Sequence, residues 1–98
     1  MSLYELIRLR SEYETVRDYL NKMINILSKS SVLDNISKAQ NCLSSNYLVD
    51  DNAGKYNKIG NRKEEIRSNI SKLRSILRDV EREINDLTRA IESYEEEE

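Results

Sequence analysis

Residues 56–94 read YNKIGNRKEEIRSNISKLRSILRDVEREINDLTRAIESY, and their apolar positions recur in alternating steps of three and four. Only Lys63 interrupts the series, which consists of Tyr56, Ile59, Ile66, Ile70, Leu73, Leu77, Val80, Ile84, Leu87, Ile91 and Tyr94. A mean step of about 3.5 residues predicts a helix with one apolar seam that supercoils against a partner helix. We expect this helix over about residues 53–94, followed by an acidic tail at 95–98.

A second stripe of the same spacing precedes it, formed by Leu6, Leu9, Tyr13, Val16, Leu20, Met23 and Leu27. Ser2 and Glu5 form a capping box, so we expect this helix to begin at about residue 2. The stripe resumes one residue out of phase at Leu33, after the polar stretch Ser28–Ser31. A bend or short break there explains the skip, and the helix is predicted to continue to about residue 44.

The turn formers of the chain gather between these helices, at about residues 45–52. The turn motif consists of Tyr47, Leu48, Asp50, Asp51 and the nearby Gly54. Two helices of about 40 residues joined by so short a turn can only lie side by side in opposite directions. The sequence therefore predicts an all-α fold, in which residues 1–98 form a single domain: a long, antiparallel, coiled-coil-like two-helix hairpin.

Further apolar residues lie beside the predicted seam, where a two-helix hairpin cannot cover them. They are Tyr4, Ile7, Tyr19, Ile24, Ile26, Val32 and Ile76. Burying seven such side chains contributes on the order of 10 to 15 kcal/mol, before the costs of association are subtracted. These residues are the predicted partner interface, and we expect the hairpin to form a bundle of four or more helices by oligomerisation, as a homodimer or with another protein.

The composition argues against an enzyme. The chain has no His, the commonest general base and zinc ligand, and a nucleophile at the single Cys42 would need a basic partner of that kind. The paired carboxylates Asp50-Asp51 and Glu64-Glu65 have no third ligand at a useful spacing, so we interpret them as solvated. We therefore predict no catalytic, cofactor-binding or metal-binding residues.

Nucleic acid and membrane are not expected partners either. The basic residues of the second helix alternate with acidic ones, and pairs such as Arg82–Asp86 and Asp86–Arg89 have the spacing of ion pairs within a helix. No apolar run approaches the roughly 18 residues of a membrane span, and the N-terminus lacks the pattern of a cleaved signal peptide. These features predict a cytoplasmic protein.

The length, the mid-chain turn and the C-terminal Tyr94-x-x-x-Glu98 resemble the small WXG-type helical hairpin proteins of bacterial type VII secretion. The turn stretch from Asn46 to Lys55, with Lys58-Ile59 after it, is similar to that of the small proteins encoded beside LXG toxins. The chain has no Trp, so Asn52-Ala53-Gly54 stands where the family has Trp-x-Gly, and only the glycine matches. Toxin-associated relatives can lack this Trp.

The resemblance implies a targeting factor or chaperone that binds the N-terminal helical domain of an LXG-type toxin. A second small helical hairpin protein and the secretion ATPase are the other implied partners, Tyr94 and Glu98 would form the secretion signal, and the protein would leave the cell with its cargo. The alternative is a generic homo-oligomeric coiled-coil adaptor, or a phage-encoded structural or inhibitory protein. The periodicity does not separate the two functions.

Overall fold

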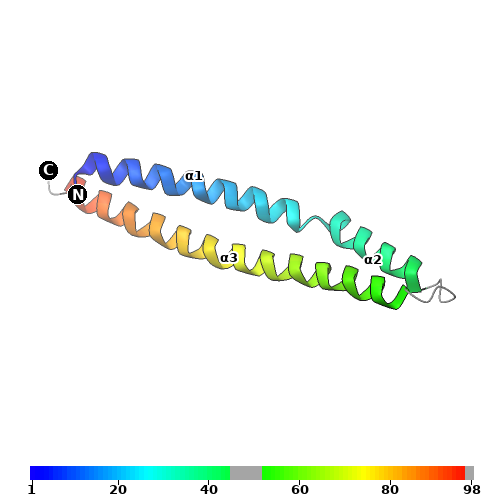
Figure 1. Ribbon diagram of the computed structural model, residues 1–98. Helices are drawn as coiled ribbons and strands as arrows, with labels where there is room; N and C mark the ends of the chain where they lie inside the picture. The colour runs from blue at the N-terminus through cyan, green and yellow to red at the C-terminus, as the bar shows by residue number, and fades with distance from the viewer. Residues whose placement is uncertain (45–51, 97–98) are drawn as a thin grey trace. The chain divides into compact units, whose positions relative to one another are not determined.

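The computed structural model describes residues 1–44 and 52–96, and this part of the chain is helical with no strand (Figure 1). Its elements are α1 (Leu3–Leu27), α2 (Ser30–Ser44) and α3 (Asn52–Glu96). The prediction of an all-α hairpin fold is confirmed, whereas its completion into a larger bundle stays a prediction. The predicted turn residues Tyr47, Leu48, Asp50 and Asp51 lie outside the described residues.

The N-terminus of α1 is capped by Ser2. Its hydroxyl oxygen accepts a hydrogen bond from the backbone amide of Glu5 at 3.2 Å, and its carbonyl accepts the first helical hydrogen bond, from Leu6 at 3.0 Å. Four amides at a helix start have no partner within the helix, so a side-chain acceptor stabilises the first turn. The Glu5 carboxylate adds a negative charge where the helix dipole is positive.

Replacing this cap should have a measurable cost. We expect Ser2→Ala to lower the free energy of unfolding by about 1 kcal/mol, because the Glu5 amide loses its acceptor. Urea unfolding followed by circular dichroism measures this change. Ser2→Asp, which restores an acceptor, should unfold at nearly the wild-type urea concentration, and an equal loss in both variants would contradict the capping role.

The chain leaves helical geometry at Ser28 and Lys29, within the stretch where the sequence predicts a bend or short break. The backbone amide of Ser28 still donates to the Ile24 carbonyl at 2.8 Å, four residues back. The amide of Lys29 instead donates to the Ile26 carbonyl, only three residues back, at 3.5 Å. The next helix, α2, begins just after this point, and the backbone amide of Val32 in its first turn donates to the Lys29 carbonyl at 3.0 Å. The predicted first helix is therefore two helices, and the break accounts for the one-residue phase shift of the apolar stripe.

The described chain divides into two compact units. The first unit joins Met1–Met23 to the part of α3 that begins at Leu73, and the start of α1 lies beside the end of α3, so these segments are antiparallel (Figure 1). Its buried apolar side chains are Leu20, Val80, Leu87 and Ile91. None of them is completely enclosed, as expected where only two helices share a core.

The second unit comprises Ile24–Lys72, and its buried apolar side chains are Ile24 and Ile70. Two contacts establish its direction: Ser37 of α2 meets Lys63 of α3, and Gln40, further along α2, meets Tyr56, which is earlier in α3. Advancing along α2 therefore means moving backwards along α3. The segments of this unit are antiparallel too.

The seam predicted for α3 is confirmed from Ile59 to Ile91, where every seam position is buried or half-buried. Tyr56 and Tyr94, at the two ends of the series, are exposed. Lys63 keeps its place in the seam despite its charge, because its long aliphatic stem can pack while its amine reaches a polar partner.

Candidate functional site

Five of the seven residues predicted to meet a partner are exposed: Tyr4, Ile7, Tyr19, Ile26 and Ile76. Val32 is half-buried and Ile24 is buried, with 7% of its surface exposed. The prediction for Ile24 is therefore wrong, because this side chain already belongs to the core of the second unit. Binding by the exposed residues stays a prediction, since no partner chain is present.

The burial of Ile24 comes from the way α1 turns its side chains toward the core. Arg17, Leu20, Ile24 and Leu27 are the residues that are buried or half-buried in this stretch, again in steps of three and four. Arg17 occupies a seam position because its methylene stem can pack while its guanidinium group reaches Asp18 at 3.2 Å. Val16 and Met23, which the sequence places in the seam, lie outside it.

This rotation leaves a short apolar surface on α1, which we call the outer stripe: Val16, Tyr19 and Met23. Their exposed fractions are 44%, 62% and 47%. Steps of three and four place them on one side of the helix, beside the core-facing side. Lys22 holds its amine 5.4 Å from the centre of the Tyr19 ring, which is a cation–π distance. Neighbouring apolar side chains exposed together form a candidate interaction surface.

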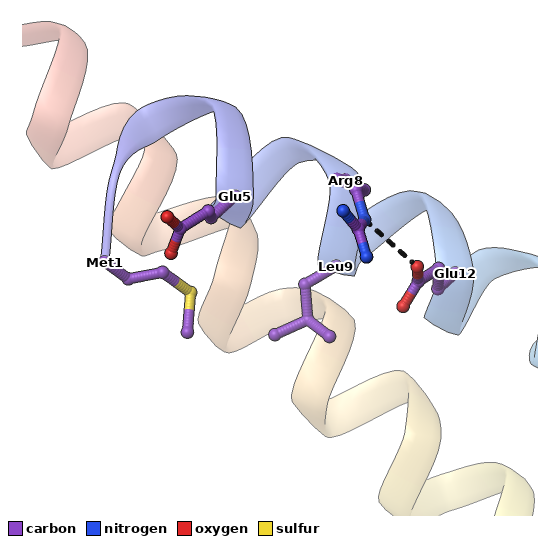
Figure 2. Close-up of a pocket in the computed structure, with 5 residues that line it drawn as sticks. All are labelled: Met1, Glu5, Arg8, Leu9 and Glu12. Atoms are coloured by element: carbon purple, nitrogen blue, oxygen red, sulfur yellow. Dashed lines mark hydrogen bonds and ion pairs between the residues drawn. The ribbon is translucent and has the colours of Figure 1, made fainter.

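Toward the N-terminus the same side of α1 becomes polar. A surface pocket there is lined by Met1, Glu5, Arg8, Leu9 and Glu12 (Figure 2). The dashed contact in Figure 2 joins Arg8 Nε to the Glu12 carboxylate at 3.3 Å. Both partners of this ion pair are largely exposed, so it adds little stability.

Polar contacts join α2 to α3 in the second unit. Lys63 Nζ donates to Ser37 Oγ at 2.9 Å, and Gln40 Nε2 donates to the Tyr56 carbonyl at 3.3 Å. Gly60 makes room for Gln40, since a Cβ added there would lie 2.9 Å from the Gln40 amide nitrogen. Polar residues in a helical seam fix the pairing register and cost stability relative to apolar ones.

We expect the double variant Ser37→Ala/Lys63→Met to raise the free energy of unfolding by about 1 kcal/mol. It removes a part-buried ammonium together with its hydrogen-bond partner, leaving neither group unsatisfied. Urea unfolding measures the change, and Lys72→Met, at an exposed position of the same helix, is the matched control and should shift stability by less than about 0.5 kcal/mol. A loss of more than about 1 kcal/mol in the double variant would show that the polar pair stabilises the unit.

The remaining predicted features are placed as follows. Gly54 lies exposed near the start of α3, and Tyr94 lies near its end with 37% of its surface exposed. Glu98 is outside the described residues, so the spacing between Tyr94 and Glu98 is not seen. Cys42 lies on α2 and is exposed.

Several charged side chains of α3 form ion pairs with neighbours on the same helix. Glu64 and Glu65 accept from Arg67 at 3.1 Å and Arg62 at 2.9 Å. The predicted pair Asp86–Arg89 is present at 3.6 Å, whereas Arg82 pairs with Asp79, one turn before it, instead of Asp86. Within residues 1–44 and 52–96, no three His, Cys, Asp or Glu side chains are grouped as metal ligands.

None of the described helices is long and apolar enough to span a membrane. Comparison with known protein families, with curated proteins and with solved structures gives no match for this chain. The outer stripe and the polar positions that precede it on α1 are therefore the features from which a function can be argued.

Proposed function

We propose that this protein is a non-enzymatic binding partner of another helical protein, which it covers along α1. The observation that carries the proposal is the outer stripe. Val16, Tyr19 and Met23 are exposed although the core of the same helix lies next to them. Covering three such side chains would contribute roughly 5 to 8 kcal/mol before association costs, at about 60 to 100 Å² each.

The proposed partner is the N-terminal helical domain of an LXG-type toxin, and the proposed role is that of a targeting factor or chaperone for type VII secretion. The resemblance of the turn stretch and of the C-terminal tail supports this choice. A toxin domain made of amphipathic helices would expose apolar faces before secretion, and a hairpin with an apolar stripe of its own could shield them. Cytoplasmic assembly followed by export with the cargo belongs to the same proposal.

Co-expression tests the partner. The tagged N-terminal domain of the LXG protein encoded nearest to this chain should retain it through purification in a defined ratio, and deleting this chain should lower secretion of the toxin. The N-terminal domain of an unrelated LXG protein is the control. Equal retention by both domains, or retention by neither, would refute the proposed partner.

A separate variant tests the secretion signal. Tyr94→Ala should leave the complex intact and reduce secretion of both proteins, because the tyrosine is accessible near the end of α3 for recognition by the secretion ATPase. Tyr56→Ala is the matched control, since Tyr56 has a similar exposed fraction of 39% but lies in the other unit. Normal secretion with Tyr94→Ala would exclude the signal role.

A further inference from the structure

We propose that the outer stripe and the polar positions before it form one continuous docking seam for a single amphipathic helix of another protein, and that this helix carries basic residues opposite Glu5 and Glu12. The inference rests on the proposed function in one respect, namely that the chain binds a helical partner. It goes further in assigning the contact side, its length and the charge pattern of the occupant.

The register of α1 supports a continuous seam. Glu5, Leu9, Glu12, Val16, Tyr19 and Met23 follow one another in steps of four and three. Side chains at this spacing stay on one side of a helix and meet a partner that supercoils around it. From Glu5 to Met23 the seam is about 27 Å long, which an ordinary partner helix of about 20 residues would cover.

The seam is accessible along its length. Its apolar half, the outer stripe, is exposed, and in its polar half Glu5 and Glu12 are exposed with the half-buried Leu9 between them. Arg8 flanks this half and is paired with Glu12 at 3.3 Å (Figure 2). A basic residue of the occupant would pair with Glu12 beside Arg8 or in its place. This exchange costs little free energy, because the Arg8–Glu12 ion pair is exposed to water.

The two carboxylates disfavour α1 of a second copy as the occupant and favour a helix with basic residues at these positions. A parallel pair of identical α1 helices would place Glu5 against Glu5 and Glu12 against Glu12, and facing like charges are unfavourable. An antiparallel pair would place Glu5 and Glu12 of one copy against the outer stripe of the other copy, or past the end of the other copy's α1 at Leu27. A helix with one basic half and one apolar half satisfies both parts of the seam.

Two synthetic helical peptides test the charge pattern. Both carry leucines at the seam positions of one half, and the other half carries either two lysines or two glutamates where it meets Glu5 and Glu12. Fluorescence anisotropy titration against the full chain at low salt should show the lysine peptide binding at least about tenfold more tightly. The double variant Glu5→Lys/Glu12→Lys should reverse this preference.

A second pair of variants tests the apolar half. Tyr19→Ser/Met23→Ser should weaken the lysine peptide at least about tenfold while circular dichroism shows an unchanged helix content, because both side chains are exposed. Ile76→Ser, at an equally exposed apolar position on α3, should leave binding unchanged. Equal affinity for the two peptides, absence of binding, or a homodimer that Tyr19→Ser/Met23→Ser dissociates would each overturn the proposal.

These results are independent of the toxin assignment. If the peptides behave as expected but no LXG domain is retained, the docking seam stands and the proposed partner is wrong. If an LXG domain is retained by Tyr19→Ser/Met23→Ser as well as by the wild-type chain, the partner stands and this seam is wrong.

Discussion

Ile24→Asp is expected to lower the free energy of unfolding by at least about 3 kcal/mol. Ile24 is a buried side chain of the second unit, so the substitution removes apolar contacts and places a carboxylate where water reaches only 7% of the residue surface. A domain of this size has about 5 to 15 kcal/mol of net stability, so this loss removes a large fraction of it. Urea unfolding and thermal melting, both followed by circular dichroism, should therefore show unfolding at a clearly lower urea concentration and temperature than in the wild-type chain.

Ile26→Asp is the matched control, two residues further along the same helix. Its side chain is 59% exposed, so the same chemical change should alter stability by less than about 0.5 kcal/mol. A similar loss in both variants would mean that α1 does not turn Ile24 to the core and Ile26 to the surface.

Ile91→Ala should have the second-largest effect, a loss of about 2 to 3 kcal/mol. Ile91 is the most buried of the apolar side chains in the described core, and truncating it removes transfer free energy and leaves a cavity. We expect the low end of the usual range because a two-helix core lies close to the surface and can partly collapse. Urea unfolding provides the measurement.

The control for Ile91→Ala is Ile76→Ala, on the same helix and in the same unit. Ile76 has 49% of its surface exposed, so its truncation should cost less than about 0.5 kcal/mol. If both variants lost the same stability, the seam of α3 would not be the core of the first unit.

The seam of α3 could be predicted because one pattern alone fits its residues. From Ile59 to Ile91 each step of three or four lands on an apolar residue, apart from Lys63, and no neighbouring set offers an apolar series of equal length. Burial then follows the period of the helix. The cap at Ser2 was also predictable, because it depends only on residues within one turn.

The side of α1 that faces the core could not be predicted in the same way. Between Tyr13 and Leu27 two series satisfy the spacing equally, one through Val16 and Met23 and the other through Arg17 and Ile24. The first series is apolar at every position, so the sequence favours it as the core-facing one. In the structure the second series faces the core, with the aliphatic stem of Arg17 in the seam. The sequence does not predict the outer stripe for this reason, since the apolar pattern places Val16 and Met23 in the core.

The polar contacts between α2 and α3 in the second unit could not be predicted without knowing how the two helices pair. The sequence marks Lys63 as an exception in an apolar series. Its partner Ser37 is 26 positions away along the chain, and Gln40 is 16 positions from Tyr56, so these contacts can be found only once the pairing register of the helices is known. Periodicity within one helix contains no information about register between two. The same limit applies to the proposed partner, because an exposed stripe does not give the sequence of a protein that would bind it.

The central claim, that the chain is built to bind a different helical protein, is tested most directly by size-exclusion chromatography with light scattering. The isolated chain is measured first, and then the chain together with the N-terminal domain of the LXG protein encoded nearest to it. We predict a monomer or loose dimer that converts to a defined heteromeric complex. A tight homo-oligomer whose mass is unchanged by that domain would contradict the account and favour a self-assembling adaptor.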